Sequence, residues 1–364
     1  MMEQNNYPDF RFNLREAAGA VGDYGTLFPI VVGVSMITEI QLAPVLFFFA
    51  IFYILSGIYY RLPVPVEPMK AIGAVAIAGG LSAGEIRAAG IIMGLLFLMV
   101  GYFRLMDKLA RVISDSLVRG VQLALALSFF QVASGYIYED LFVGLIAVGI
   151  ILVFTFSPLL DISSLVVLVG GVAYGIYLQG SPETQLLALQ LPALPELPSF
   201  GTGFIRGVLP QIPVTVGNSI LATSLLSFEL LNKRIDTDQL AGTVGVMCLV
   251  SSPLGGLPMC HGAGGLAAQY RFGARTGGSN IISGLILLPL AMFLATPQLL
   301  EIIPGGVLGA LLFFTGIQLL KSVLKTDNWL ITGITGLVGI VNIALAFVSM
   351  LVVDLVYRKL NRQN

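Results

Sequence analysis

Two short stretches of this chain place proline, glycine and charged side chains inside otherwise apolar sequence. The first is LPVPVEPMK, residues 62–70, and the second is LPMCHGAGG, residues 257–265. Each begins with Leu-Pro, continues through residues that favour extended backbone, and leads into an apolar run too short to cross a bilayer. A helix that begins inside the membrane has unpaired N–H groups and a positive dipole end at its start. Two such helix starts facing each other would bind an anion.

The candidate anion contacts come from the ends of these two stretches. They are Met69, Lys70, Ala71, His261, Gly262, Ala263, Gly264 and Gly265. Glycine lets the anion approach the backbone closely, although close helix packing is the other common use of glycine in membranes. Lys70 adds a positive charge, and the high cost of a charge at mid-membrane favours a site over a snorkelling lysine. His261, the only histidine, could touch the anion with its ring or serve as a helix cap.

Further polar residues within apolar runs complete the candidate site. Gln211 and Thr215 are four residues apart, so they share a helix face and can donate hydrogen bonds to oxyanion oxygens or to neighbouring helices. Asp23, Glu67 and Asn218 are candidates for coupling or gating. Acids inside membranes are commonly functional, although Asp23 could also be a structural hydrogen-bond acceptor, and the Asn218 amide can donate hydrogen bonds to oxyanion oxygens. A lone histidine is a poor metal ligand, and no nucleophile–base pair is evident. We therefore expect neither a metal, nor another cofactor, nor an enzyme.

Composition indicates a polytopic membrane protein. The 364 residues are 56% hydrophobic and only 11% charged, whereas soluble domains carry about 25% charged residues. The net charge of −1 offers no basic surface for nucleic acid. The expected partner is therefore the lipid bilayer, which helices span by satisfying their own backbone hydrogen bonds.

The apolar runs fall into two sets of seven, which predicts an all-α protein of fourteen spans. We expect the spans at about 17–38, 43–60, 68–80, 86–103, 113–135, 140–156, 162–179, 203–228, 239–252, 261–272, 279–296, 304–320, 328–341 and 342–357. The third span of each set is the interrupted one, as in transporters built from repeats. Seven is odd, so the second set must run in the opposite sense. The predicted organisation is an inverted repeat at 1–180, an extracytoplasmic linker at 181–202 and a second repeat at 203–364.

Basic residues predict the orientation. With the N-terminus in the cytoplasm, sixteen of the 19 lysines and arginines fall on the cytoplasmic side. This bias is typical of cytoplasmic loops. We expect both termini in the cytoplasm and the chain in a cell inner or plasma membrane.

The segments PVPVEPMKAIGAVAIA and LPMCHGAGGLAAQYRFGARTGGSN, together with GAVGDYGTLFP, resemble the signature motifs of the molybdate transporter family, which is related to the sulfate permeases. The resemblance implies a fourteen-span fold with core and gate domains, import of molybdate, and possible transport of tungstate or sulfate. It also implies a chain without the soluble C-terminal domain of sulfate permeases. Relatives on this fold are often dimers, so a homodimer is a further expectation.

One residue departs from the family pattern. The family motif has glutamine before Pro-Met-Lys, and this chain has Glu67. A carboxylate three residues before Lys70 can pair with it or occupy the positive helix end itself. Either arrangement opposes a dianion unless Glu67 is protonated. We therefore hypothesise that protons are coupled to transport.

Other functions remain open at this stage. A sulfate or general oxyanion carrier needs the same donors. A nucleobase–proton symporter on the same fold would be expected to read its base with acids in spans eight and ten, where this chain has Gln211 and His261. An anion channel would conduct without accumulating its ion. An intramembrane enzyme has the least support.

Overall fold

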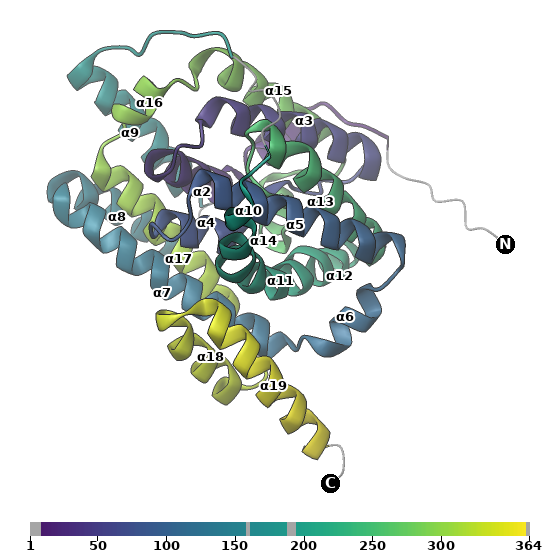
Figure 1. Cartoon of the computed structure of the whole chain (residues 1–364). Coiled ribbons are helices and arrows are strands. Elements are labelled where there is room, and N and C mark those ends of the chain that lie inside the picture. The colour runs from purple at the N-terminus through teal and green to yellow at the C-terminus, as the bar shows by residue number, and fades with distance from the viewer. Residues whose placement is uncertain (1–8, 158–160, 188–193, 362–364) are drawn as a thin grey trace.

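The structure is a computed structural model that describes residues 9–157, 161–187 and 194–361. Most of these residues are helical (Figure 1). The expected linker at 181–202 lies partly outside the described residues, which stop at 187 and resume at 194.

The first half of the chain carries the helices that were expected before the linker. Its elements are α1 (Leu14–Ala20), α2 (Tyr24–Ile37), α3 (Leu42–Tyr60), β1 (Glu67–Pro68), α4 (Lys70–Ile77), α5 (Ala83–Tyr102), α6 (Met106–Val112), α7 (Asp115–Glu139), α8 (Leu141–Phe156) and α9 (Ser163–Gln179). The short α4 is the third predicted span, and it begins at Lys70, directly after the extended segment.

The second half repeats this plan with more irregular helices. Its elements are α10 (Leu197–Thr202), the π-helix η1 (Gly203–Val208), α11 (Leu209–Val214), the π-helix η2 (Thr215–Leu221), α12 (Ala222–Leu231), α13 (Thr237–Ser251), the 3₁₀ turn η3 (Ser252–Leu254), β2 (Met259–Cys260), α14 (Ala263–Phe272), α15 (Gly278–Pro289), the π-helix η4 (Leu290–Leu294), α16 (Pro297–Glu301), α17 (Gly305–Val323), α18 (Trp329–Val341) and α19 (Ile343–Asn361). Helix α14 starts at Ala263, so His261 lies in the extended segment and not in the predicted span 261–272.

Each of the fourteen predicted spans contains a helix. Six helical stretches in the described residues are both long and apolar enough to cross a membrane. The remaining spans are shorter or interrupted helices, which fits the fourteen-span fold.

The helices form two groups, and each half of the chain contributes to both. The core group consists of α1–α5 and α10–α15, in which α3 packs on α15 and α5 on α13. The gate group consists of α7–α9 and α17–α19, in which α7 packs on α17 and α18. Figure 1 shows the gate group down the left side and at the bottom of the molecule. The cavity described below lies between the two groups.

Small residues set the close packing inside the core group. A Cβ at Gly101 of α5 would lie 2.6 Å from the backbone nitrogen of Gly242 on α13, and one at Gly94 would lie 2.7 Å from Leu249. Bare backbone at these positions lets the two helices approach closely, which is a usual device in membranes.

Some helix starts away from the cavity are capped by neighbouring side chains. Ser82 and Glu85 form a capping box at α5, and Asp236 accepts hydrogen bonds from the first turn of α13. The N-cap residues of α4 and α14, Met69 and Gly262, make no such side-chain bond. The starts of the two interrupted helices are therefore left to partners from elsewhere in the fold.

Candidate functional site

Two extended segments bring the interrupted helices together. Strands β1 and β2 pair antiparallel, with Glu67 opposite Cys260 and Pro68 opposite Met259. The Met69 N–H donates to the Pro258 carbonyl at 3.0 Å. Helices α4 and α14 begin two and three residues after their strands end, so their N-termini meet at the same place. This is the arrangement that the Leu-Pro stretches predicted.

The start of α14 holds the carboxylate of Glu67. The Gly265 N–H donates to Glu67 Oε1 at 2.9 Å, and the Lys70 ammonium pairs with Glu67 Oε2. The carboxylate lies so close to Gly262 that a Cβ there would overlap it. Both interactions foreseen for Glu67 therefore occur together. The positive helix end is occupied by an anion that belongs to the protein.

A second carboxylate converges on the same point. Asp23, fully buried between α1 and α2, accepts a hydrogen bond from the Tyr53 hydroxyl through Oδ2 at 2.6 Å. No described residue donates to its Oδ1. A Cβ built at Gly265 would lie 2.5 Å from both Asp23 Oδ1 and Glu67 Oε1, so the two acids are near neighbours. Only glycine fits between them.

The start of α4 is bound by an amide from the eighth predicted span. Gln211 Oε1 accepts hydrogen bonds from the Ala71 N–H at 2.8 Å and the Ile72 N–H at 3.4 Å. Its Nε2 donates to Thr215 Oγ1 at 2.9 Å. Gln211 and Thr215 therefore face each other as their spacing predicted. In this structure Gln211, held by Thr215, pairs with the free N–H groups at the start of α4, and both side chains are fully buried.

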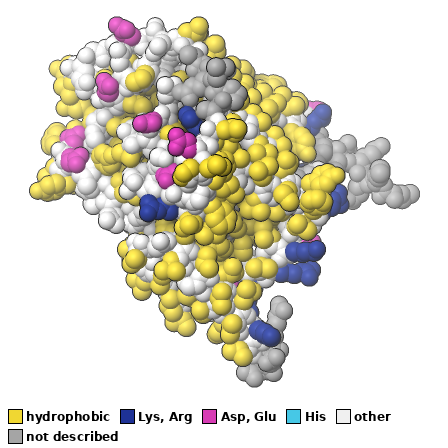
Figure 2. Space-filling view, in the orientation of Figure 1, with side chains coloured by type: hydrophobic (Ala, Val, Ile, Leu, Met, Phe, Trp, Pro, Cys, Tyr) yellow, Lys and Arg dark blue, Asp and Glu magenta, His cyan; other side chains and the backbone are white. Residues whose placement is uncertain are grey.

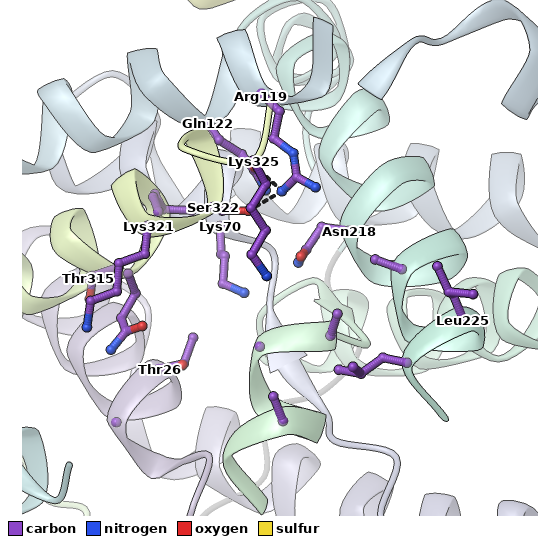
Figure 3. A pocket seen from close by; sticks show the side chains of 18 of the residues that line it. Thr26, Lys70, Arg119, Gln122, Asn218, Leu225, Thr315, Lys321, Ser322 and Lys325 are labelled. Atoms are coloured by element: carbon purple, nitrogen blue, oxygen red, sulfur yellow. Dashed lines mark hydrogen bonds between the residues drawn. The ribbon is translucent and has the colours of Figure 1, made fainter. Parts of the chain in front are cut away.

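A cavity of about 370 Å³ reaches these helix starts from between the two helix groups. Among the predicted site residues, Lys70, Asn218, Ala263 and Gly264 line it. The opposite wall is formed by residues of α7 and α17 and by Lys325, which follows α17, as Figure 3 shows. Lys321 and Lys325 are exposed, so the cavity is open at their end.

Donors remain at the inner end of this cavity. No described residue accepts a hydrogen bond from the backbone N–H groups of Ala263 and Gly264. A Cβ at Gly264 would meet nothing within 4 Å. Unpaired N–H groups beside an ammonium group can coordinate an oxyanion.

The remaining predicted site residues lie behind this surface. Met69, Ala71, Asp23, Glu67, Gln211, Thr215, Gly262, Gly265 and His261 do not line the cavity. They hold the helix starts in place or neutralise them in this conformation.

The ring of His261 binds the extended segments to α13. Its Nδ1 lies 2.9 Å from the Pro65 carbonyl, and its Nε2 lies 2.8 Å from Thr243 Oγ1. Because a carbonyl only accepts, Nδ1 carries the hydrogen and Nε2 accepts from the threonine. The His261 carbonyl accepts from Ser219 Oγ at 2.5 Å. All three bonds favour the cap-like alternative for this residue over ring contact with an anion.

A family model described as "Molybdate transporter of MFS superfamily" matches residues 15–129 and 203–319, which make up most of each half of the chain and include both interrupted helices. The chain belongs to the molybdate transporter family. It is an integral membrane protein, and the sequence resemblance to this family is confirmed.

Relatives of the family match along most of their length. "Molybdate transporter 1" of Arabidopsis thaliana is 33% identical over 372 residues, which are 85% of this chain and 80% of the relative. "Molybdate transporter 1" of Chlamydomonas reinhardtii is 27% identical over 437 residues, covering 86% of this chain and 84% of the relative.

The fold of this family member is shared with solved anion transporters. The transmembrane domain of the cyanobacterial bicarbonate transporter BicA superposes with a TM-score of 0.68 at 18% identity, covering 96% of this chain and 98% of that domain. Murine Solute Carrier 26 family member A9 in the inward-facing state superposes with a TM-score of 0.70 at 11% identity, covering 98% of this chain and 70% of that chain. The predicted fold class is thereby confirmed.

Several residues that shape the site are absent from the set predicted from the sequence. Tyr53 supports Asp23, and Ser219 fixes the backbone of His261. Glu16 accepts hydrogen bonds from the Arg275 and Thr276 N–H groups and so fixes the loop after α14. An acid at the edge of the first apolar run was the one available signal, and it pointed to Glu16.

Proposed function

We propose that the chain is a secondary transporter that imports molybdate, which binds between the starts of α4 and α14. The observation that carries this proposal is the position of Glu67. Its carboxylate is held by a helix N–H and an ammonium group, so this place already accommodates an oxygen anion. Bound molybdate would meet Lys70 together with the free N–H groups of Ala263 and Gly264, and it would leave to the cytoplasm through the cavity.

The names of the relatives support molybdate as the substrate. Tungstate and sulfate are also tetrahedral dianions, so the same donors could hold them. Uptake of molybdate into proteoliposomes, with excess sulfate or tungstate outside, tests this. Molybdate accumulation that excess sulfate leaves intact supports the proposal. Inhibition by sulfate would make the protein a general oxyanion carrier, and conductance without accumulation would make it a channel.

Proton coupling is supported by the two converging acids. Asp23 and Glu67 lie beside the same helix start, where two negative charges repel each other and oppose a dianion. A proton on this pair would remove that repulsion as molybdate enters. We propose that the pair takes up a proton with the anion and releases it on the other side. Alkalinisation outside proteoliposomes during uptake would support coupling.

Charge distribution supports cytoplasmic termini and an inner or plasma membrane. Figure 2 shows acidic side chains at the upper left, Lys and Arg mainly along the right and lower edges, and much hydrophobic surface between them. Labelling of Lys108→Cys and Glu183→Cys by an impermeant maleimide in intact cells tests this, since both residues are exposed. Only the cysteine at 183 should react. The reverse result would invert the topology.

We also propose an inverted repeat within the chain and a homodimer. The repeats at 1–180 and 203–364 are proposed to be related by inversion, because each contributes one interrupted helix to the site. A homodimer is proposed by analogy with the fold. Native mass spectrometry of the purified protein would reveal the oligomeric state.

A further inference from the structure

The cavity has a second group of cationic side chains on the wall that faces the half-helix site. Arg119 of α7 donates through Nε to Asp115 at 3.1 Å and through Nη1 to Ser322 of α17. A longer contact of 3.5 Å joins Nη1 to Gln122. These partners hold the guanidinium in place. Figure 3 shows Arg119 and Lys325 beside each other at the cavity.

Part of this group has no partner among the described residues. No described side chain or carbonyl accepts from Arg119 Nη2 or from the Lys325 ammonium group. Asn218 of η2 lines the same cavity from the core group, and its side-chain amide has no hydrogen-bond partner among the described residues either. Glu229 is the acid that lines this cavity among the described residues. Positive charge is therefore in excess here, even though Asp115 offsets Arg119.

We propose that Arg119, Lys325 and Asn218 form a second and weaker site for a tetrahedral oxyanion. It rests on the proposed function, since the ion it holds is the one released from the half-helix site. The N–H groups of Arg119 Nη2, held in place by the other bonds of the guanidinium, can donate to oxygens of such an ion, and the ammonium and amide groups can reach the others. The same cavity is lined by Lys70 and Gly264, so an ion can pass between the two sites without crossing lipid.

Basic residues at a cytoplasmic surface commonly serve only as anchors. Lys108 of α6 has that character, because it is exposed and does not line the cavity. Lys325 is also exposed but lines the cavity, and this difference makes Lys108 a matched control. A phospholipid headgroup has the same phosphate chemistry as a free oxyanion. The inference commits to the free ion because the cavity leads inward to the core group.

The test is calorimetric titration of molybdate into the full chain in nanodiscs of zwitterionic phosphatidylcholine. We expect a tight event and a weak event, and the weak one should fade as ionic strength rises. Lys325→Ala should weaken the weak event about tenfold and spare the tight one. Lys108→Ala should leave both unchanged. Lys325→Gln gives a second variant of similar length should the alanine form be unstable.

A wild type that shows the tight event alone, or a weak event that Lys325→Ala and Lys325→Gln leave intact, would overturn the second site. Added phosphatidylglycerol should not remove the weak event. If the weak event disappears when this lipid is added, Arg119, Lys325 and Asn218 bind lipid headgroups instead. Loss of the tight event alone would instead contradict the half-helix site. The failure of the proposed function is thereby distinguished from the failure of this inference.

Discussion

The Glu67 carboxylate accepts a hydrogen bond from the Gly265 N–H at 2.9 Å, which joins the end of one interrupted segment to the helix start of the other. These residues are 198 positions apart in the chain. The contact places a protein anion where the substrate anion is proposed to interact. Substrate binding must therefore weaken the hold on Glu67 or neutralise it.

Replacing Glu67 by glutamine tests this competition. The amide can still accept from Gly265 but carries no charge, so Lys70 becomes available to the substrate. We expect Glu67→Gln to bind molybdate about tenfold more tightly at neutral pH. Wild-type binding should strengthen as pH falls, because a protonated Glu67 no longer competes, and the variant should lose this trend. Calorimetry over a pH series measures both.

Exposed Glu183 provides the control for this change, since Glu183→Gln should keep the wild-type pH dependence. A Glu67→Gln protein that keeps the wild-type pH dependence of binding would exclude Glu67 as the coupling group.

Removing Lys70 separates stability from binding. Lys70→Ala leaves Glu67 buried without its cationic partner, which should cost about 3–5 kcal/mol of stability. The double variant Glu67→Gln/Lys70→Gln has no unpaired charge and should recover most of that loss. Its molybdate affinity should still be about 100-fold lower than that of Glu67→Gln. Thermal unfolding and calorimetry report the two effects, and equal affinity in both variants would remove Lys70 from the site.

Two neighbouring glycines should respond differently to alanine. A Cβ at Gly265 would lie 2.5 Å from oxygens of Asp23 and Glu67, so Gly265→Ala should destabilise the fold by about 1–3 kcal/mol. A Cβ at Gly264 meets nothing within 4 Å, so Gly264→Ala should unfold like the wild type. Its methyl group enters the cavity and should weaken molybdate binding. Equal unfolding temperatures for the two variants would contradict the packing described here.

His261 is expected to act on stability. His261→Ala removes the partners of the Pro65 carbonyl and Thr243, which should cost about 1–3 kcal/mol. Thr243→Ala loses one of these bonds and should cost about 1 kcal/mol. The folded fraction of both variants should bind molybdate with unchanged affinity. A His261→Ala protein of wild-type stability that no longer binds would restore ring contact with the anion.

Much of the fold could be predicted because a membrane constrains sequence strongly. Apolar runs located the helices, and the Leu-Pro stretches located the two interrupted ones, with α4 starting at Lys70. Both depend on local chemistry, namely apolar length and the conformational limits of proline. The start of α14 was misplaced by two residues, since His261 and Gly262 are extended.

Side-chain directions in the site could not be predicted in the same way. Gln211 was expected to face the anion, yet its amide binds the start of α4, which is 140 residues away in the chain. The pairing of Tyr53 with Asp23 likewise depends on how two helices pack. Such contacts are set by tertiary packing, which leaves no periodic pattern in a single sequence. The two options for Glu67 were foreseen because both arise within one turn of a helix start.

The most direct test of the central claim is molybdate binding to the purified protein, measured by calorimetry at two pH values with and without excess sulfate. We expect a tight binding event that survives sulfate and strengthens at the lower pH. The absence of molybdate binding at both pH values would contradict the anion site between the starts of α4 and α14.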